Sequence, residues 1–220
     1  DENLTVITRS FCDADDPVAY PYPSYILYES LARIQGCNVV RLNLNSEWQW
    51  NPDDAARLRK KVRVFFVPCP NSPTGNIWSE EQLSQLLPDR GVLVLDEAYG
   101  DFCQVPHRGE LLRSQLFDSR MIVTRTFSKS YSLAGIRFGF AIAHPDLICG
   151  MEKVKDSYNC DTIAIAAATA ALQDQDWMLL NRSKILATRD RLAAALAAWG
   201  FTVHPSEANF LWTSHVTGQH

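Results

Sequence analysis

The sequence predicts an α/β protein in which a mostly parallel sheet lies between two layers of helices. Short apolar runs rich in β-branched and aromatic residues alternate with longer stretches of helical periodicity. Because parallel strands need a crossover connection, usually a helix, this alternation favours a parallel sheet that is covered on both faces. A chain of 220 residues with 46% hydrophobic content can build one large domain of this kind or two small ones.

The first third of the chain contains two helix-strand units. Apolar residues in 4–11 follow helical spacing, and residues 18–20 form a short extended run after a polar interruption. Residues 24–35 place their apolar side chains on one helical face and stop at Gly36, a typical C-terminal cap. Residues 38–42 look extended and complete the second unit.

The middle of the chain repeats the pattern with longer apolar runs. Ser79 predicts a helix start, because a hydroxyl cap is followed there by two acidic residues in the first turn. The expected elements are strands at 62–67, 92–95, 121–125 and 138–143, and helices at 79–87 and 109–116.

The character of the chain changes after Pro145. Alanine-rich helices are expected at 162–172 and 177–199, and Gly200 ends the second one. Residues 201–203 and 209–213 look like the first strands of a smaller unit. The predicted organisation is a large domain over residues 1–175, followed in residues 176–220 by a long connecting helix and the start of a small α/β domain.

Composition excludes several classes of protein. The net charge is -4 and the pI about 5.7, with no basic stripe of the kind that nucleic acids require. No apolar run is long enough to span a bilayer, and the first residues do not resemble a signal peptide, so the expected compartment is the cytoplasm. The six cysteines are scattered without a C-x-x-C pair, which predicts reduced thiols and no metal site.

Three polar segments directly follow predicted strands, where ligand-binding groups gather in parallel sheets. They are residues 70–75, 96–99 and 126–129. Each alone has an ordinary explanation: a turn for the first, a helix cap for Asp96 and a solvated surface lysine for Lys129. Their occurrence together and in this order is what indicates chemistry.

These segments resemble the class I/II aminotransferases, which use pyridoxal phosphate on the fold called type I, and in particular the histidinol-phosphate aminotransferase branch. The lysine segment with Arg137 eight residues on is the most specific part. Residues 23–25 and 206–210 also fit that branch. The matching motifs are Pro70-Asn71-Ser72-Pro73-Thr74-Gly75, Asp96-Glu97-Ala98-Tyr99 and Arg125-Thr126-Phe127-Ser128-Lys129-Ser130-Tyr131-Ser132-Leu133-Ala134-Gly135-Ile136-Arg137-Phe138-Gly139.

The resemblance implies roles for individual residues. Lys129 corresponds to the lysine that forms the resting Schiff base with the cofactor and later moves a proton, and Asp96 to the carboxylate that keeps the pyridine nitrogen protonated. Tyr99 corresponds to the donor to the ring oxygen, and Arg137 to the phosphate-binding arginine. The remaining implied contacts are Ser128 and Thr126 at the phosphate, Tyr25 on the ring face, Asn209 near the substrate, and Asp1 at a helix N-terminus that cradles the phosphate.

The sequence departs from the family in two places. Many relatives have Asn-Asn-Pro-Thr-Gly where this chain has Asn71-Ser72-Pro73, so the contact to the ring oxygen is shared between Asn71 and Ser72 as candidates. Family members are also about half as long again. We therefore expect the N-terminal arm, and the part of the small domain that carries a substrate-binding arginine, to lie outside these 220 residues.

The predicted function is transfer of an amino group between an amino acid, or a phosphorylated amine like histidinol phosphate, and a 2-oxo acid. One alternative is a pyridoxal-phosphate decarboxylase of the threonine-phosphate type, which breaks a different bond at the same carbon. Another is an aminotransferase-like regulatory module that binds the cofactor without turnover. The expected partners are small molecules and a second copy of the chain, because the resemblance implies a homodimer.

Overall fold

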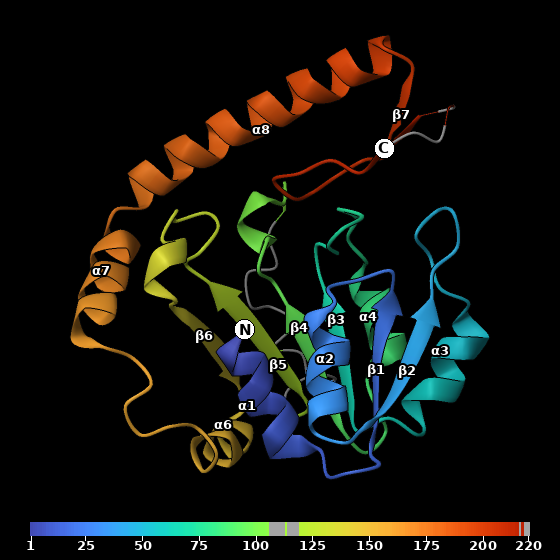
Figure 1. Ribbon diagram of the computed structural model, residues 1–220, viewed down its shortest axis with the longest axis vertical. Helices are drawn as coiled ribbons and strands as arrows, with labels where there is room; N and C mark the ends of the chain where they lie inside the picture. The colour runs from blue at the N-terminus through green and yellow to red at the C-terminus, as the bar shows by residue number, and fades with distance from the viewer. Residues whose placement is uncertain (106–112, 114–118, 216, 218–220) are drawn as a thin grey trace.

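The structure is a computed structural model that describes residues 1–105, 113, 119–215 and 217. A six-stranded sheet in the order β2-β1-β3-β4-β5-β6 forms its centre (Figure 1). Its strands are β1 (Pro17–Tyr22), β2 (Asn38–Asn43), β3 (Val64–Pro68), β4 (Val92–Asp96), β5 (Met121–Thr126) and β6 (Gly139–Ala143).

The sheet brings the ends of its central strands to one edge. Strands β1 to β5 pair in parallel, and β6 joins β5 in the antiparallel direction. The carboxyl ends of β3, β4 and β5 therefore lie next to one another, at Pro68, Asp96 and Thr126. The start of β6 lies there too, because Gly139 pairs with Thr126. A Cβ atom at Gly139 would lie 2.7 Å from the carbonyl oxygen of Arg125, so this close pairing requires a glycine.

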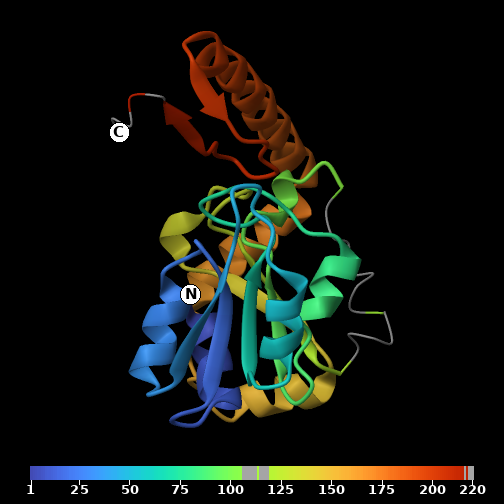
Figure 2. The same cartoon turned by 90° about the vertical axis from the view of Figure 1, so that its right-hand side faces the viewer.

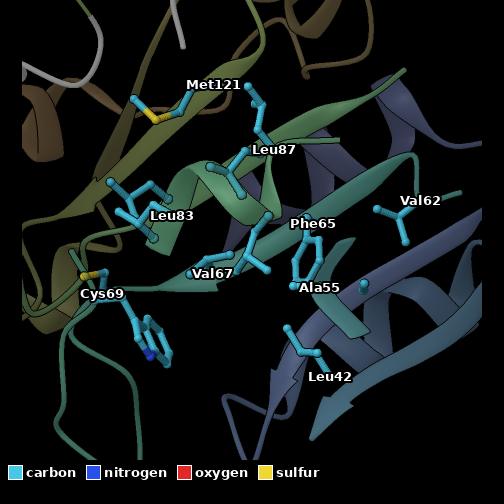
Figure 3. Close-up of a cluster of buried hydrophobic side chains, with 14 of the residues drawn as sticks. Leu42, Ala55, Val62, Phe65, Val67, Cys69, Leu83, Leu87 and Met121 are labelled. Atoms are coloured by element: carbon cyan, nitrogen blue, oxygen red, sulfur yellow. The ribbon is translucent and has the colours of Figure 1, made fainter. Parts of the chain in front are cut away.

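Helices cover both faces of the sheet, as the two perpendicular views show (Figures 1 and 2). On one face lie α1 (Glu2–Phe11), α2 (Leu27–Ile34) and α6 (Pro145–Glu152), which share a buried cluster with β1, β3 and β4. On the other face lie α3 (Pro52–Arg59) and α4 (Glu80–Leu86). Their buried side chains join Phe65, Val67 and Met121 in a second cluster (Figure 3). Burial of both sheet faces explains why the strands read as continuous apolar runs.

The C-terminal part leaves the sheet. Helix α7 (Thr162–Gln173) leads into the long α8 (Gln175–Ala198), which lies beyond the carboxyl edge of the strands (Figure 1). A small antiparallel pair follows, β7 (Phe201–Val203) with β8 (Thr213–His215). Two short 3-10 helices, η1 (Gly100–Phe102) and η2 (Ala134–Ile136), follow β4 and precede β6.

The predicted fold class, a mostly parallel sheet between two helical layers, is confirmed. Helices α3 and α6 were not predicted. Each begins with a proline in its first turn and a capping side chain, from Asn51 and His144 respectively. Helix α3 buries only Ala55, so its apolar periodicity is weak.

Two further boundaries differ from the prediction. The strand expected at 209–213 is wrong over most of its length, because β8 begins only at Thr213. The preceding residues are held by the large domain instead: the Glu207 amide donates to the Gly75 carbonyl at 2.8 Å, and Phe210 packs edge-on against Tyr99. The helix expected at 24–35 begins at Leu27. The helix expected at 109–116 lies, except for residue 113, outside the described residues.

Within the part of the chain that the structure describes, no helix combines the length and the apolar content that crossing a membrane requires.

Candidate active site

A cavity of about 520 Å³ opens at the carboxyl edge of β3, β4 and β5. The first turn of α1 and the residues that follow β5 form its other walls. In open parallel sheets this edge is where ligands bind, because loops from several strands converge there. Nine of the predicted site residues line the cavity: Asp1, Tyr25, Ser72, Asp96, Tyr99, Thr126, Ser128, Lys129 and Arg137.

Asp96 supplies a buried carboxylate to this cavity. It is the last residue of β4 and is 8% exposed. Its Oδ2 accepts a hydrogen bond from the Tyr28 hydroxyl at 2.7 Å, and its Oδ1 accepts one from the Ala98 amide at 3.1 Å. Burial raises the pKa of Asp96 above its usual value, and these two donors act in the opposite direction by stabilising the ionised form. Asp96 is thus a buried acid at the cavity wall, and each of its two oxygens accepts a hydrogen bond.

Lys129 extends from the loop after β5 into the same cavity. Its Nζ lies 5.0 Å from the centre of the Tyr99 ring, within the range of a cation-π contact. The loop is shaped by local hydrogen bonds, since Thr126 Oγ1 accepts from the Ser128 amide at 3.1 Å and the Lys129 carbonyl accepts from the Ser132 amide at 3.1 Å. An amine is thus presented beside a phenol at the cavity wall.

A cluster suited to an anion occupies another wall. The first residues of α1 line the cavity, and unpaired amides at a helix N-terminus attract negative charge. Arg137 lies beside them, with its Nη2 3.1 Å from Asp1 Oδ2, and the Tyr25 hydroxyl donates to Asp1 Oδ1 at 3.2 Å. The Arg137 side chain is 63% exposed, so its guanidinium remains accessible to a ligand.

Two predicted residues do not line this cavity. Asn71 is fully buried and holds a turn: its Nδ2 donates to the Pro23 carbonyl and to Thr74 Oγ1, and its Oδ1 accepts from Ser24 Oγ. Of the two candidates in this turn, Ser72 is the one that reaches the cavity. Asn209 lines a separate cavity of about 260 Å³ beside α8.

Sequence reasoning missed several residues of the site. Tyr28 lies three residues after Tyr25, and helical spacing could have placed it on the same side. Glu97 and Arg125 lie inside the recognised motifs, but their role as an ion pair was not anticipated: the Arg125 Nε donates to Glu97 Oε2 at 2.8 Å. Asn159 and Cys160 also line the cavity, and no sequence pattern marks them.

A known family model matches almost the whole chain. The family model described as "Aminotransferase class I and II" matches residues 1–219. The chain belongs to the class I and II aminotransferase family.

Individual relatives agree with this assignment. A histidinol-phosphate aminotransferase from Rhodopirellula baltica is 46% identical over the whole chain, which covers 60% of that protein. One from Geotalea daltonii is 40% identical over 97% of the chain and 60% of its own length. The chain thus spans about 60% of the length of the curated relatives it matches.

Solved structures share the fold. The crystal structure of histidinol-phosphate aminotransferase from Sinorhizobium meliloti in complex with pyridoxal-5'-phosphate has a TM-score of 0.86 and 29% identity, covering 96% of this chain and 58% of that one. An aspartate aminotransferase from Thermus thermophilus with maleate has a TM-score of 0.84 and 23% identity, covering 96% of this chain and 59% of its own. At 23% identity, the likeness to the aspartate aminotransferase shows a shared fold alone.

Proposed function

We propose that this protein acts as a pyridoxal-phosphate-dependent aminotransferase. One observation carries the proposal: a single cavity gathers the buried Asp96 carboxylate, the Lys129 amine and the anion cluster of Arg137 with the N-terminus of α1. Pyridoxal phosphate presents the three matching groups, which are a basic ring nitrogen, an aldehyde and a phosphate. The family assignment, and the cofactor in the related Sinorhizobium meliloti structure, support the choice.

The residues present fit this cofactor. A cavity of about 520 Å³ lies within the range of roughly 300–1,000 Å³ that small-molecule and cofactor sites occupy. Asp96 is buried and has donors that stabilise its ionised form, as a partner for a protonated ring nitrogen requires. When bound, the cofactor supplies an electron sink for charge that develops at the substrate carbon.

The chain's own residues then have distinct tasks. Asp96 holds a proton on the ring nitrogen, and Arg137, Ser128 and Thr126 with the first amides of α1 hold the phosphate. Lys129 would hold the cofactor through its aldehyde group, and its amine, when free, would move a proton at the substrate carbon. Tyr99 and Ser72 are candidates to donate to the ring oxygen, and Tyr25 to contact the ring.

We assign the substrates by class. The amino donor is an amino acid or a phosphorylated amine like histidinol phosphate, and the acceptor is a 2-oxo acid; the relatives named histidinol-phosphate aminotransferase support this choice. The test is to mix purified protein, pyridoxal phosphate, histidinol phosphate and an isotopically labelled 2-oxo acid, and to follow the acid by mass spectrometry. Conversion of the labelled acid to its amino acid supports transamination.

The same mixture identifies the alternatives. Release of carbon dioxide from a phosphorylated amino acid, without amino transfer, would instead indicate a decarboxylase. Binding of the cofactor with neither product would indicate a module without turnover.

We also propose that two copies associate. Apolar side chains are exposed on α7 and on the start of α8, where burial against another chain would remove them from water. They are Ile163, Ile165, Leu172, Trp177, Leu179 and Leu180. Sedimentation equilibrium checks this, since a mass of twice 24.8 kDa is expected and a monomer at all concentrations contradicts it. We further propose the cytoplasm as the compartment, which the six free thiols support. The proposed domain boundary lies between residues 175 and 176, next to the start of α8 at Gln175.

A further inference from the structure

Alternate side chains of the segment after β4 contact the end of β5 and the loop that follows it. Residues 98–99 form a turn after β4, and Asp101 belongs to the 3-10 helix η1 that follows it. Three contacts are made: Glu97 pairs with Arg125 near the end of β5, and Tyr99 and Asp101 contact Lys129 and Ser130 in the loop after it. The lysine therefore lies between two polar contacts, one on each side of it along the chain.

Asp101 takes part on both sides of the lysine. Its Oδ2 accepts a short hydrogen bond from the hydroxyl of Ser130, the residue directly after Lys129. Its Oδ1 accepts from Arg125 Nη1 at 3.2 Å, four residues before Lys129. Ser130 is 3% exposed, so its hydroxyl has little access to water as a replacement partner. One carboxylate thus fixes both flanks of the lysine loop.

The backbone that carries Asp101 is itself anchored. Arg182 of α8 donates from Nε to the Asp101 carbonyl and from Nη2 to the Cys103 carbonyl, each at 2.5 Å. Phe102 and Cys103 beside it are buried. Because the carboxylate stands on a fixed segment, its contacts restrict the lysine loop and do not simply follow it.

Asp101 is not among the residues that line the cavity. Its influence on the site must pass through Arg125 and Ser130, both of which belong to the lysine segment. We propose that Asp101 is a positioning residue for Lys129, which holds the loop so that the amine meets its reaction partner in one orientation. This proposal rests on the proposed function, in which Lys129 bonds to pyridoxal phosphate.

The test uses four variants. Asp101→Ala removes both contacts, and Ser130→Ala removes only the hydroxyl. Ser130→Thr restores a hydroxyl at the same place. Asp54→Ala is the matched control: Asp54 also accepts from an arginine, at 2.5 Å from Arg57, but Arg57 does not line the cavity, whereas Arg125, the partner of Asp101, does.

The first measurement is the rate at which pyridoxal phosphate is captured on Lys129, followed by borohydride reduction and mass spectrometry across pH 6–10. We expect capture about 10- to 100-fold slower in Asp101→Ala and Ser130→Ala, because small misplacements of a reacting group cost this much. The pH profile of capture should shift as well. Ser130→Thr should recover most of the rate, and Asp54→Ala should keep all of it.

The second measurement needs no cofactor. Amide hydrogen exchange of residues 127–133 in the unliganded protein should become about 10- to 100-fold faster in Asp101→Ala, as loss of a charged hydrogen bond predicts. If the wild-type protein captures no cofactor, the proposed function is wrong. Hydrogen exchange still tests whether Asp101 holds the loop that contains Lys129.

Wild-type exchange of residues 127–133 in both Asp101→Ala and Ser130→Ala would overturn the proposal. Equal capture rates and pH profiles in wild type, Asp101→Ala and Ser130→Ala would also overturn it. If Asp101→Ala does not fold, the comparison of Ser130→Ala with Ser130→Thr decides alone: failure of the threonine to restore capture and exchange contradicts the proposal.

Discussion

Asp96 depends on a neighbour that no motif contains. The Tyr28 ring stacks on Phe66 with 4.9 Å between ring centres, and its hydroxyl reaches Asp96 at 2.7 Å. The tyrosine is fully buried, so its position is fixed by packing of α2 against β3. A packing residue of one helix thereby sets the electrostatics of the carboxylate at the end of β4.

Tyr28→Phe tests this link. The substitution removes the hydroxyl and keeps the ring, so the ionised form of Asp96 loses a donor and its already raised pKa should rise further. Loss of a hydrogen bond to a charged group costs about 1.5–3 kcal/mol, so the rise in the pKa of Asp96 should be measurable. NMR titration of aspartate labelled at Cγ measures the change. An unchanged titration of Asp96 in a folded variant would show that Tyr28 serves packing alone.

Single residues of the site were predictable only through their order along the chain. Lys129 by itself resembles a surface lysine, and it is indeed exposed. Its significance came from its spacing to Asp96 and Arg137. Asn71 belongs to the same motifs, yet its side chain is occupied within the turn, because which of two neighbouring polar residues faces a cavity depends on backbone geometry that the motif does not encode.

Among the helices and strands, the predictions that are confirmed rest on local sequence signals. The helix start predicted at Ser79 is confirmed as a capping box, with reciprocal hydrogen bonds between Ser79 and Gln82. Helices α3 and α6 have caps as well, but their short, weakly amphipathic sequences gave no periodicity. The strand predicted at 209–213 failed because contacts of Glu207 and Phe210 with the large domain override local preference.

The turn after β3 contacts the C-terminal segment at Gly75, next to Ser206. Gly75 has φ +80°, and a Cβ atom there would lie 2.5 Å from Ser206 Oγ. Gly75→Ala should destabilise the protein by about 1–3 kcal/mol, because strain at positive φ adds to the clash. Urea unfolding measures it. Combining Gly75→Ala with Ser206→Gly should recover part of the loss, while Gly135→Ala, where the structure leaves open space, should be nearly neutral.

An equal cost of Gly75→Ala with and without Ser206→Gly would mean that the close approach to residue 206 contributes nothing. The backbone strain would then account for the whole effect.

For the whole molecule, burial of Glu97 predicts a dependence of stability on pH. Burial outweighs the Arg125 guanidinium and raises the pKa of Glu97 from 4.5 to about 7. The unfolded chain releases this proton near pH 4.5 and the folded chain near pH 7, so Glu97's contribution to stability is complete below pH 4.5 and is lost as pH rises through 7. The loss is at most about 3 kcal/mol.

Urea unfolding at pH 5 and pH 8 measures this contribution. Wild-type protein should lose more free energy of unfolding between these two pH values than Glu97→Gln, whose side chain does not titrate. An equal loss in both proteins would show that Glu97 ionises in the folded state as it does in the unfolded chain.

The architecture of the sheet was predictable because its strands alternate with helices, while the placement of its last strand was not. Strand β6 runs antiparallel to β5, and the apolar run that predicted it carries no information on direction. That reversal places the start of β6 beside the lysine loop, where the Phe138 carbonyl accepts from the Phe127 amide at 3.1 Å. The topology therefore completes a cavity wall that the strand pattern alone did not predict.

The proposed function requires that Lys129 holds pyridoxal phosphate in this cavity. The most direct measurement incubates the purified protein with the cofactor, reduces it with borohydride and maps the product by peptide mass spectrometry. We expect a visible absorption band and a cofactor mass on the peptide that contains Lys129, both absent in Lys129→Ala. Attachment at other lysines only, or an identical band in Lys129→Ala, would contradict it.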